Sequence, residues 1–438
     1  ARANVFLALF ERSYGSPQKS QKKMKSLQKF IYYLQSLFNI RFNPFFCGKK
    51  DILFSGGQRR VLNKDNLWWD IHVDPLLEDL EMSYVSLEYP VGMDHRSPAK
   101  TPHLKHYDVI DTLGVIRKLL GFSKVRLNQK DHALLEKIRN KFKEVFGVQV
   151  DVKAITMARI KERDEHLPLC VKLLKQIQPK IVVIVTSYAR EPLIEACKLL
   201  TIPVVELQHG VITPYHPGYS FPKSARKKIR FPDYLFVFGE HWKHHIDYPI
   251  SNERIFATGF PFLENMIKHR SKKRRKNQII IISQPRSGVP ISKFAVELSS
   301  RSDFDCNILY KLHPLEIPTW REQYPWLVDS DIEVLDSLET DLHKLLSESK
   351  MQLGVGSTAV FEGLAFGLRT FILDLPGSEY FDSFIQSGQA TKVSTVDDLI
   401  ASLSQDIIDR PRNTEFVLVK NGVRLTLDAI EGLLRKNS

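Results

Sequence analysis

The chain has no long apolar run, only four cysteines, and none of the common nucleotide-binding fingerprints. Its longest apolar stretches, such as residues 181–185 and 279–282, are the length of one strand, far short of the roughly 20 residues that span a bilayer. The cysteines show no CxxC pair and no metal-ligand spacing, which predicts free thiols in a reducing cytoplasm. No Walker A string occurs, and no GxGxxG follows an early strand, so the sequence excludes sites of these two kinds.

The composition indicates a folded, basic protein with more than one domain. A length of 438 residues predicts two or three domains, and a hydrophobic fraction of 43% excludes wholesale disorder. The formal net charge is +13, and residues 1–50 carry ten Lys and Arg against the single acid Glu11. Two further basic clusters lie at residues 223–230 and 268–276. Such clusters attract anionic lipid, nucleic acid or phosphorylated substrates, and a solvated basic face is the open alternative.

The N-terminal segment, residues 1–50, contains one amphipathic pattern. Apolar residues recur at helical spacing between Met24 and Phe38, with several lysines close by. A basic amphipathic helix of this kind lies either in a membrane interface or on the protein's own core. The sequence leaves both interpretations open, and we expect this segment to be partly helical.

Beyond residue 51, predicted strands and helices begin to alternate. The continuous apolar run at residues 181–185 is typical of a strand that a parallel sheet buries on both faces, and residues 202–207 are a further predicted strand. The stretch 267–277 is basic and poor in apolar residues, so we predict a linker there.

After the linker the alternation starts again, with strand-like runs at 278–283, 307–311 and 370–374. The sequence therefore predicts an α/β protein with two doubly wound, Rossmann-like domains that face a central cleft. The N-terminal domain would comprise residues 51–266, and the C-terminal domain residues 278–438.

A turn rich in small and hydroxyl residues is the densest signal in the second half. Gly356, Ser357 and Thr358 follow a predicted strand, and Glu362 lies one turn further along the expected helix. Backbone N–H groups and hydroxyls at a helix start bind phosphate. A plain N-cap role for Ser357 or Thr358 is the competing interpretation. Glu362 would hydrogen-bond a ribose diol, or would merely favour the positive end of the helix.

Two more loops are expected at the same sheet edge. Lys311 and His313 follow the second strand of this half, and Arg286 and Ser287 follow the first. A histidine before proline is held extended, and an imidazole donor there would neutralise a leaving phosphate. A guanidinium also suits phosphate. These residues form the predicted phosphate-binding edge.

A histidine occupies the corresponding place in the first half. Gln208, His209 and Gly210 directly follow an apolar run, and the glycine permits a sharp turn that leaves the imidazole projecting. A histidine with a pKa near 6.5 suits a general base, whereas a turn histidine bonded to the backbone is the structural alternative. Other acceptor-side candidates are His216, Asp70 and Asp94.

These motifs resemble those of GT-B-fold glycosyltransferases that build bacterial capsules and surface polysaccharides. Bacterial sialyltransferases, polysialyltransferases and Kdo-transferases carry an HP motif and a Ser or Ser-Thr motif, similar here to His313-Pro314 and Ser357-Thr358. The resemblance implies that this histidine and these hydroxyls contact the phosphate of a CMP-sugar. Teichoic acid glycerophosphotransferases are similar too, and their His-Gly motif, thought to hold the base, looks like His209-Gly210. UDP-GlcNAc 2-epimerases share the fold and a comparable His-x-x-Pro loop.

The resemblance covers about residues 180–385 and implies an inverting, metal-independent glycosyltransferase that needs no cofactor. The favoured donor is a CMP-activated acidic sugar such as a sialic acid or Kdo, and the acceptor would be a glycan or a lipid-linked molecule. His209 would act as the base, while His313 stabilises the leaving phosphate. Basic clusters would hold the cytoplasmic enzyme at the inner face of the cell membrane, in contact with anionic lipid.

Three alternatives stay open at this stage. The first is a CDP-glycerol-type glycerophosphotransferase, and the second is a UDP-GlcNAc 2-epimerase-like enzyme. The third is a non-catalytic basic protein that binds nucleic acid or a polysaccharide assembly complex. Nucleic acid is not the expected partner, because the basic stretch 268–276 contains no aromatic residue.

Overall fold

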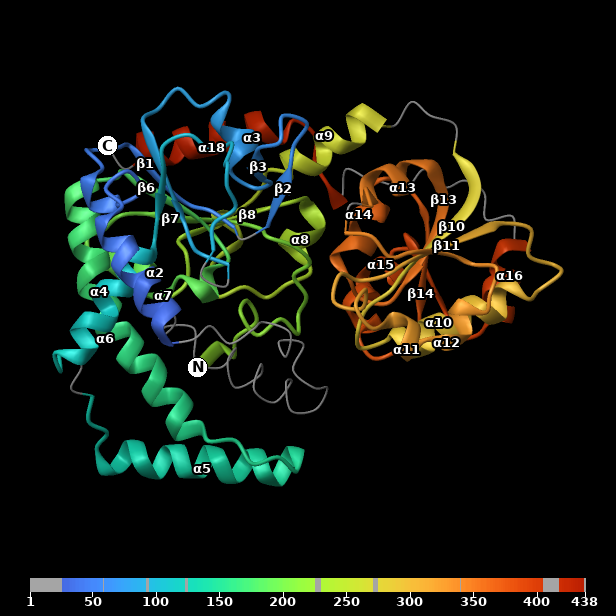
Figure 1. Ribbon diagram of the computed structural model, residues 1–438, viewed down its shortest axis with the longest axis horizontal. Coiled ribbons are helices and arrows are strands. Elements are labelled where there is room, and N and C mark those ends of the chain that lie inside the picture. Colours follow the sequence, from blue (N-terminus) through green and yellow to red (C-terminus); the bar gives the residue numbers. More distant parts are fainter. Residues whose placement is uncertain are drawn as a thin grey trace.

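The protein consists of two α/β domains that lie side by side (Figure 1). The computed structural model describes residues 26–57, 59–91, 94–122, 125–224, 230–270, 275–338, 340–404 and 417–436. Each domain is built on one parallel sheet, so the predicted pair of parallel-sheet domains is confirmed. No helix in the described part of the chain is long and apolar enough to cross a membrane.

The N-terminal domain contains a seven-stranded sheet in the order β5-β4-β1-β6-β7-β8-β9. The strands are β1 (Ile52–Ser55), β4 (Tyr84–Glu88), β5 (Leu104–His106), β6 (Ile181–Val185), β7 (Val204–Leu207), β8 (Tyr234–Val237) and β9 (Ile255–Ala257). A separate antiparallel hairpin joins β2 (Arg60–Leu62) to β3 (Trp68–Asp70). Strand order grows outward in both directions from β1, so the winding reverses between β1 and β6.

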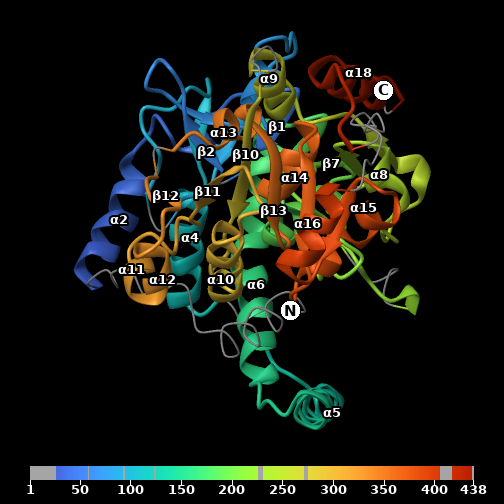
Figure 2. The same cartoon turned by 90° about the vertical axis from the view of Figure 1, so that its right-hand side faces the viewer.

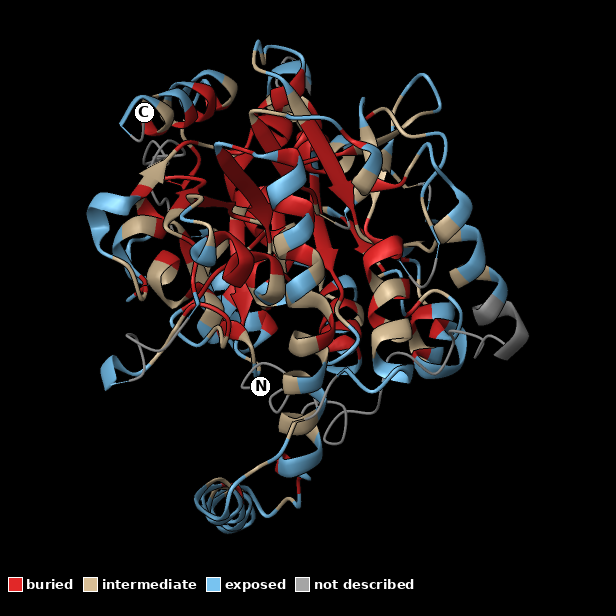
Figure 3. Cartoon of the chain, turned by 90° about the vertical axis from the view of Figure 1, so that its left-hand side faces the viewer, coloured by how far each residue is buried: buried red, intermediate tan, exposed pale blue. Residues whose placement is uncertain are grey.

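Helices cover both faces of this sheet because its strands are apolar on both sides. Leu53 and Val182 pack toward one group of helices, whereas their neighbours Ile52 and Ile181 pack toward the other, as the two-residue period of a strand requires. The helices on the first face are α4 (Asp108–Leu119), α6 (Val152–Ile177) and α7 (Glu191–Leu199). Those on the second face include α3 (Asp74–Leu77) and α18 (Gly422–Lys436), with α8 (Glu240–His244) and α9 (Pro261–Arg270) toward the second domain. Buried strands fill the centre of the molecule (Figure 3).

The C-terminal domain contains a six-stranded parallel sheet in the order β12-β11-β10-β13-β14-β15. The strands are β10 (Lys276–Ile282), β11 (Asn307–Lys311), β12 (Glu333–Leu335), β13 (Ser349–Gly354), β14 (Arg369–Leu373) and β15 (Ala390–Val393). The helices are α10 (Gly288–Ser299), α11 (Trp320–Gln323), α12 (Pro325–Val328), α13 (Leu342–Glu348), α14 (Thr358–Ala365), α15 (Asp382–Gln386) and α16 (Val396–Ser404). Here the winding reverses between β10 and β13.

The last helix does not stay with the second domain, although the sequence analysis assigned residues 278–438 to one unit. Leu427, Ile430 and Leu433 of α18 pack with Leu76 and Leu77 of α3. The helix α18 thus lies beside α3 on the N-terminal domain (Figure 1). The physical reason is that one face of the seven-stranded sheet has to be covered, and the apolar stripe of α18 covers part of it. The chain therefore crosses between the domains twice.

Two helices lie at the margin of the N-terminal domain. The described part of the N-terminal segment forms α2 (Ser26–Phe38), which packs on α4, and residues 1–25 lie outside the described part. α5 (Gln129–Phe146) projects away from the body (Figures 1 and 2). Of the predicted linker 267–277, α9 occupies the first residues and β10 begins at Lys276.

Candidate active site

The carboxyl edges of both sheets meet at the domain boundary. In an open α/β sheet, ligands bind beyond the carboxyl ends of the strands, at the point where the winding reverses. The loops after β6 and β7 lie at or beside that point in the first sheet, and the loops after β10 and β13 lie there in the second. The two edges are in contact, since a Cβ atom built on Gly210 would lie 3.3 Å from Oγ1 of Thr358.

The side chains of Glu206 and Tyr219 form a hydrogen-bonded chain that orients His209. The Tyr219 hydroxyl lies 3.0 Å from Nδ1 of His209 and donates to Oε1 of Glu206 at 2.5 Å. The backbone N–H of Ser187 donates to the same oxygen at 2.9 Å. Because the single hydroxyl hydrogen of Tyr219 goes to the carboxylate, its oxygen accepts a hydrogen from Nδ1. Nε2 of His209 then carries the lone pair, which accepts the hydrogen of the Tyr188 hydroxyl at 3.4 Å.

Burial makes this imidazole neutral near pH 7. Desolvation, with a further contribution from the charge of His216, lowers the pKa of His209 to about 4. Burial also raises the pKa of the Glu206 carboxyl, although hydrogen bonds from Tyr219 and Ser187 oppose that shift. A neutral imidazole with an unprotonated Nε2 can accept a proton, which is what a general base requires.

The two loops predicted to bind phosphate, after β11 and β13, both lie at the carboxyl edge of the second sheet. Ser357 caps α14, because its Oγ accepts the N–H of Val360 at 3.3 Å, so the N-cap interpretation holds for this hydroxyl. Thr358 begins the helix and faces Gly210 of the other domain. Gly356 has to be glycine, since a Cβ there would lie 2.5 Å from the carbonyl oxygen of Gly377.

His313 is held in one tautomer by its own loop. Its Nδ1 accepts the N–H of Leu315 at 3.2 Å, so the neutral ring carries its hydrogen on Nε2. Burial lowers the pKa of His313, which favours this neutral form. The backbone N–H of His313 donates to Oε2 of the buried Glu316 at 2.8 Å. Nε2 is therefore available as a hydrogen-bond donor.

The end of β10 connects these two loops. The Ser283 hydroxyl donates to Oε1 of Glu316 at 2.8 Å, and Oε1 of Gln284 accepts the N–H of Gly356 at 3.0 Å. Since β10 lies between β11 and β13, the loops that carry His313 and Ser357 stand about two strand spacings apart, on the order of 10 Å. Ser283 and Gln284 were absent from the sequence analysis as site residues.

The other predicted phosphate ligands lie around the same edge. Ser287 is buried just before α10, and Arg286 is exposed, with its charge acting on Tyr380 beside Gly356. Lys311 is half-buried, and its Nζ donates to the carbonyl of Leu312 at 3.0 Å. Burial lowers the pKa of Lys311.

Glu362 has a different environment from the ribose site envisaged for it. Its carboxylate is almost completely buried and accepts from Arg59 at 2.9 Å and from Nε2 of His343 at 2.8 Å. Burial opposes ionisation, but the charges of Arg59 and His343 outweigh it and lower the pKa of Glu362 to about 2. Arg59 belongs to the N-terminal domain, so Glu362 joins the two domains, and its predicted contact with ribose stays a prediction.

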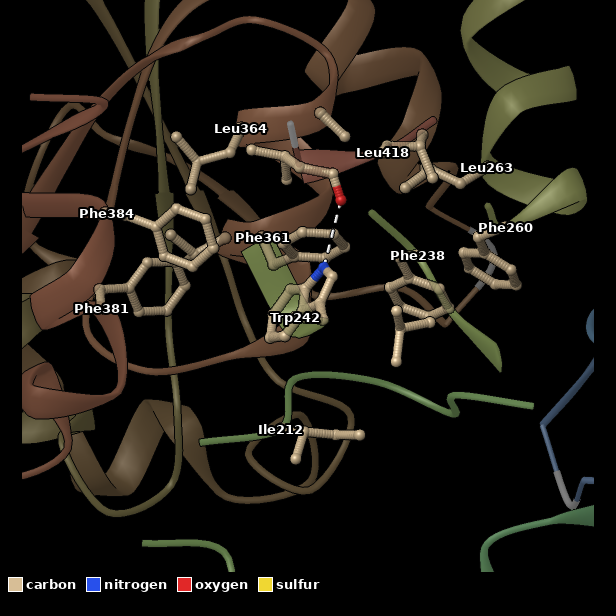
Figure 4. Close-up of a cluster of buried hydrophobic side chains, with 14 of the residues drawn as sticks. Ile212, Phe238, Trp242, Phe260, Leu263, Phe361, Leu364, Phe381, Phe384 and Leu418 are labelled. Carbon is tan, nitrogen blue, oxygen red and sulfur yellow. Dashed lines mark hydrogen bonds between the residues drawn. The ribbon is translucent and has the colours of Figure 1, made fainter. Parts of the chain in front are cut away.

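Aromatic packing closes another part of the domain boundary. Phe238 stacks on Phe361 with ring centroids 5.7 Å apart, and the indole of Trp242 lies edge-on to Phe361 at 5.1 Å (Figure 4). Nε1 of Trp242 donates to the carbonyl of Val417, just before the chain returns to the first domain. This cluster fixes the two domains next to the Gly210–Thr358 contact.

The remaining acceptor-side candidates separate into two groups. Gln208 is buried and bonds the carbonyl of Gly210, which shapes the histidine loop. The ring of His216 lies 6.1 Å from that of His209, so these two residues are together. Asp70 is fully buried, and desolvation raises its pKa to about 7. It accepts the backbone N–H groups of His72 and Val73, so it is a structural carboxyl close to the loop after β1.

Asp94 lies in a different pocket, beyond the ends of β4 and β5. Its neighbour His95 bridges Glu88 and Asp108, with 2.6 Å between the ring nitrogens and each carboxylate. Burial lowers the pKa of His95, but the hydrogen bonds to Asp108 and Glu88 outweigh it and raise the pKa to about 9. Glu88, His95 and His106 are also the one group among the described residues whose ligand atoms lie close enough to hold a metal ion.

The sequence analysis missed the residues that orient the two predicted histidines. Glu206 interrupts an otherwise apolar strand, and a carboxylate in such a run is a signal that it has a buried partner. Tyr219 was visible downstream of His209, but the pairing with Glu206 across 13 residues was not. Glu316 and His343 had no signal in the pattern.

With two parallel-sheet domains whose carboxyl edges face one another, the chain has the GT-B fold. A UDP-GlcNAc 2-epimerase from Methanocaldococcus jannaschii superposes with a TM-score of 0.53 and 13% identity, over 87% of this chain and 99% of that chain. A putative UDP-N-acetylglucosamine 2-epimerase from Listeria monocytogenes gives a TM-score of 0.52 and 13% identity, over 88% of this chain and 97% of that chain. UDP-GlcNAc 2-epimerase from Neisseria meningitidis, bound to UDP-GlcNAc, gives a TM-score of 0.50 and 13% identity, over 88% of this chain and 99% of that chain. A scan against protein-family models and a search of curated proteins find no match. At these identities the likeness shows the fold alone.

Proposed function

We propose that the protein is an inverting, metal-independent glycosyltransferase that moves a sugar from a nucleotide-activated donor onto a hydroxyl acceptor. The observation that carries this proposal is the oriented imidazole of His209. Its Nδ1 is fixed by Tyr219 and Glu206, its Nε2 is unprotonated and contacts only the Tyr188 hydroxyl at 3.4 Å among the described residues, and its loop contacts the start of α14 in the other domain. A base on one domain therefore faces a phosphate-binding helix start on the other.

The acceptor half of the reaction would use His209. The acceptor hydroxyl would give its proton to Nε2 as its oxygen forms a bond to the anomeric carbon of the donor sugar. The carboxylate of Glu206, acting through Tyr219, would stabilise the imidazolium that forms. The anionic phosphate of a bound donor would also raise the pKa of His209 from its low value without ligand, which makes the base stronger when substrate is present. A positioned base contributes about 10²–10⁴-fold to such a rate.

The donor half would use the edge of the second domain. As the bond between the anomeric carbon and the phosphate oxygen breaks, negative charge grows on the departing nucleotide. Nε2–H of His313 and the N–H groups at the start of α14 would stabilise that charge, together with Thr358 and the nearby Arg286. Ser357 would contribute chiefly through its backbone, because its hydroxyl already caps the helix.

The donor class and location follow from the resemblance and the charge. A CMP-activated acidic sugar such as a sialic acid or Kdo is the favoured donor, and a glycan or lipid-linked molecule in surface polysaccharide synthesis is the acceptor. That a structure with this fold is bound to UDP-GlcNAc supports a nucleotide sugar in general. With its net charge of +13, the enzyme would work at the cytoplasmic face of an anionic membrane.

Ligand-dependent stability tests the donor assignment. A nucleotide that binds the native state raises the unfolding temperature by mass action, so CMP, CDP, UDP and GDP are compared in a thermal-shift assay. We expect CMP to give the largest shift. A shift in unfolding temperature with CDP alone would point to the glycerophosphotransferase, if the mass of the reaction product also exceeded that of the acceptor by one glycerol phosphate. Conversion of UDP-GlcNAc without any acceptor would show an epimerase, and no shift with any nucleotide would remove the proposal.

A further inference from the structure

Three large apolar side chains lie on the exposed face of α2 between residues 31 and 38. Ile31, Leu34 and Phe38 follow one another at helical spacing and are 43%, 40% and 78% exposed. The opposite face packs on the protein, where Tyr32 bonds Asp108 and Ser36 bonds Thr112. The stripe continues into Ile40, which is 63% exposed. A contiguous apolar patch of this kind on a protein surface marks an interaction site.

A cationic pocket lies directly beside this stripe. It has a volume of about 710 Å³, and its lining contains Arg41, Lys50, Arg96 and Lys105 but no carboxylate. Within the described part of the chain, none of these four cations forms an ion pair, whereas Lys100 and Lys180 nearby pair with Glu78 and Asp51. Cations without ion-pair partners around one pocket repel one another, and a bound anion would relieve this repulsion.

The stripe and the pocket form one surface. Phe38, Ile40 and Arg41 are neighbours in the chain, and the exposed Phe46 belongs to the lining of the pocket. Apolar side chains thus border a pocket whose lining contains four cations and no carboxylate.

We propose that this surface docks on an anionic phospholipid bilayer, with a lipid phosphate in the pocket and the α2 stripe in the apolar interface. This inference deepens the membrane contact of the proposed function by assigning it to α2 and Arg41 of the basic N-terminal segment, together with Arg96 and Lys105, which lie outside the basic clusters seen in the sequence. A free anionic polymer would account for the cations but not for the exposed stripe. An amphipathic helix beside Lys and Arg side chains satisfies both conditions for interfacial binding.

Vesicle sedimentation with the full chain tests the assignment, without any nucleotide. The probes are phosphatidylcholine vesicles with and without phosphatidylglycerol. We expect binding only to the anionic vesicles, and at least about tenfold weaker binding for Arg96→Glu with Lys105→Glu, because each such cation contributes roughly 1 kcal/mol near an anionic surface. Phe38→Ser with Ile40→Ser should weaken binding by a similar factor.

Matched controls separate this surface from general charge and general apolarity. Lys130→Glu with Lys137→Glu on α5 makes the same change in net charge, and Leu119→Ser with Phe122→Ser removes comparable exposed apolar groups near the end of α4. If either control weakened binding as much as its test variant, or if the anionic vesicles did not bind at all, the assignment would be overturned. Binding of soluble dihexanoyl phosphatidylglycerol to the parent chain, and its loss in the Arg96/Lys105 variant, would support a headgroup pocket.

Linear polyphosphate distinguishes the remaining source of anions. If polyphosphate bound in the pocket while vesicles did not, the site would serve an anionic chain and the lipid assignment would fail. If no nucleotide changed the unfolding temperature, the glycosyltransferase proposal would fail, but vesicle binding would be unaffected. Loss of vesicle binding would likewise leave the nucleotide-dependent thermal shift intact, so the two outcomes can be told apart.

Discussion

Arg59 of the N-terminal domain and Glu362 of the C-terminal domain form an ion pair of 2.9 Å across the domain boundary. The carboxylate is almost fully buried, whereas the Arg59 side chain is 40% exposed. Arg59→Ala should lower the free energy of unfolding by about 3 kcal/mol, because it leaves the buried carboxylate of Glu362 without its guanidinium partner. Glu362→Gln should cost about 1 kcal/mol, because the charge left behind is that of Arg59, which is partly exposed to solvent. Urea unfolding measures both, with Lys141→Ala on the exposed helix α5 as a control that should change nothing.

Tyr219→Phe tests the orientation of His209. Without the hydroxyl, Nδ1 loses its partner and the ring no longer has one fixed tautomer, so we expect kcat to fall by about 10²-fold with little change in KM. The pH profile should change as well, because Glu206 no longer stabilises the imidazolium. A role confined to packing would leave the shape of that profile as it is. Glu206→Gln should move the profile in the same direction, and Tyr215→Phe, on an exposed side chain downstream, is the matched control.

His313→Ala should lower turnover by at least about a hundredfold while the fold survives, since it removes a donor from the charge that develops on the leaving phosphate. His313→Gln places an amide N–H donor at about the position of Nε2 and should recover part of the rate. Transferase kinetics and the unfolding temperature are measured together. Near-normal turnover in His313→Ala would remove this histidine from the donor site.

Gly210→Ala tests how closely the two edges approach. The added Cβ would meet Oγ1 of Thr358 at 3.3 Å, tighter than an ordinary contact, so the two edges would have to move apart by a few tenths of an ångström. We expect a loss of stability of about 1 kcal/mol. Thr358→Ala removes the opposing oxygen. The double variant should therefore lose less stability than the sum of the losses in the two single variants. Strict additivity in this cycle would mean that the contact is absent in solution.

Stability should depend on His95 at alkaline pH. Its pKa in the folded protein, about 9, is higher than the value near 6.5 expected for the unfolded chain. Protonation therefore stabilises the folded state fully below about pH 6.5, and this contribution is lost as the pH rises through about 9. Unfolding free energies of the parent chain should fall over that range, and His95→Gln should lack the part of the fall that depends on this ring. An identical slope in both proteins would contradict the Glu88–His95–Asp108 bridge.

The fold followed from the sequence because buried parallel strands are continuous apolar runs. Residues 181–185 and 279–282 are strands for that reason, and each site loop was found as the polar segment that follows such a run. Parallel strands place all their carboxyl ends at one edge of their sheet. The histidine loop and the Ser-Thr turn meet because the carboxyl edges of the two sheets are in contact.

Pairings between distant residues had no such local signal. Glu362 and Arg59 are 303 residues apart, and nothing in the helical pattern around Glu362 indicates that its partners are Arg59 and His343. A charged residue one turn into a helix whose start is predicted to bind phosphate has several possible roles, and only tertiary packing decides among them. The return of α18 was missed for the same reason, since an apolar stripe does not say which sheet it covers.

That return has a practical meaning for anyone who wishes to study one half of the molecule by itself. A fragment that stops at Arg270 would leave bare the part of its sheet and helix α3 that Leu427, Ile430 and Leu433 cover, and it should aggregate or fail to fold. Grafting residues 417–436 onto the end of such a fragment, through a flexible spacer, restores the missing cover. The autonomous unit is thus discontinuous in sequence, with its last piece supplied from the far end of the polypeptide.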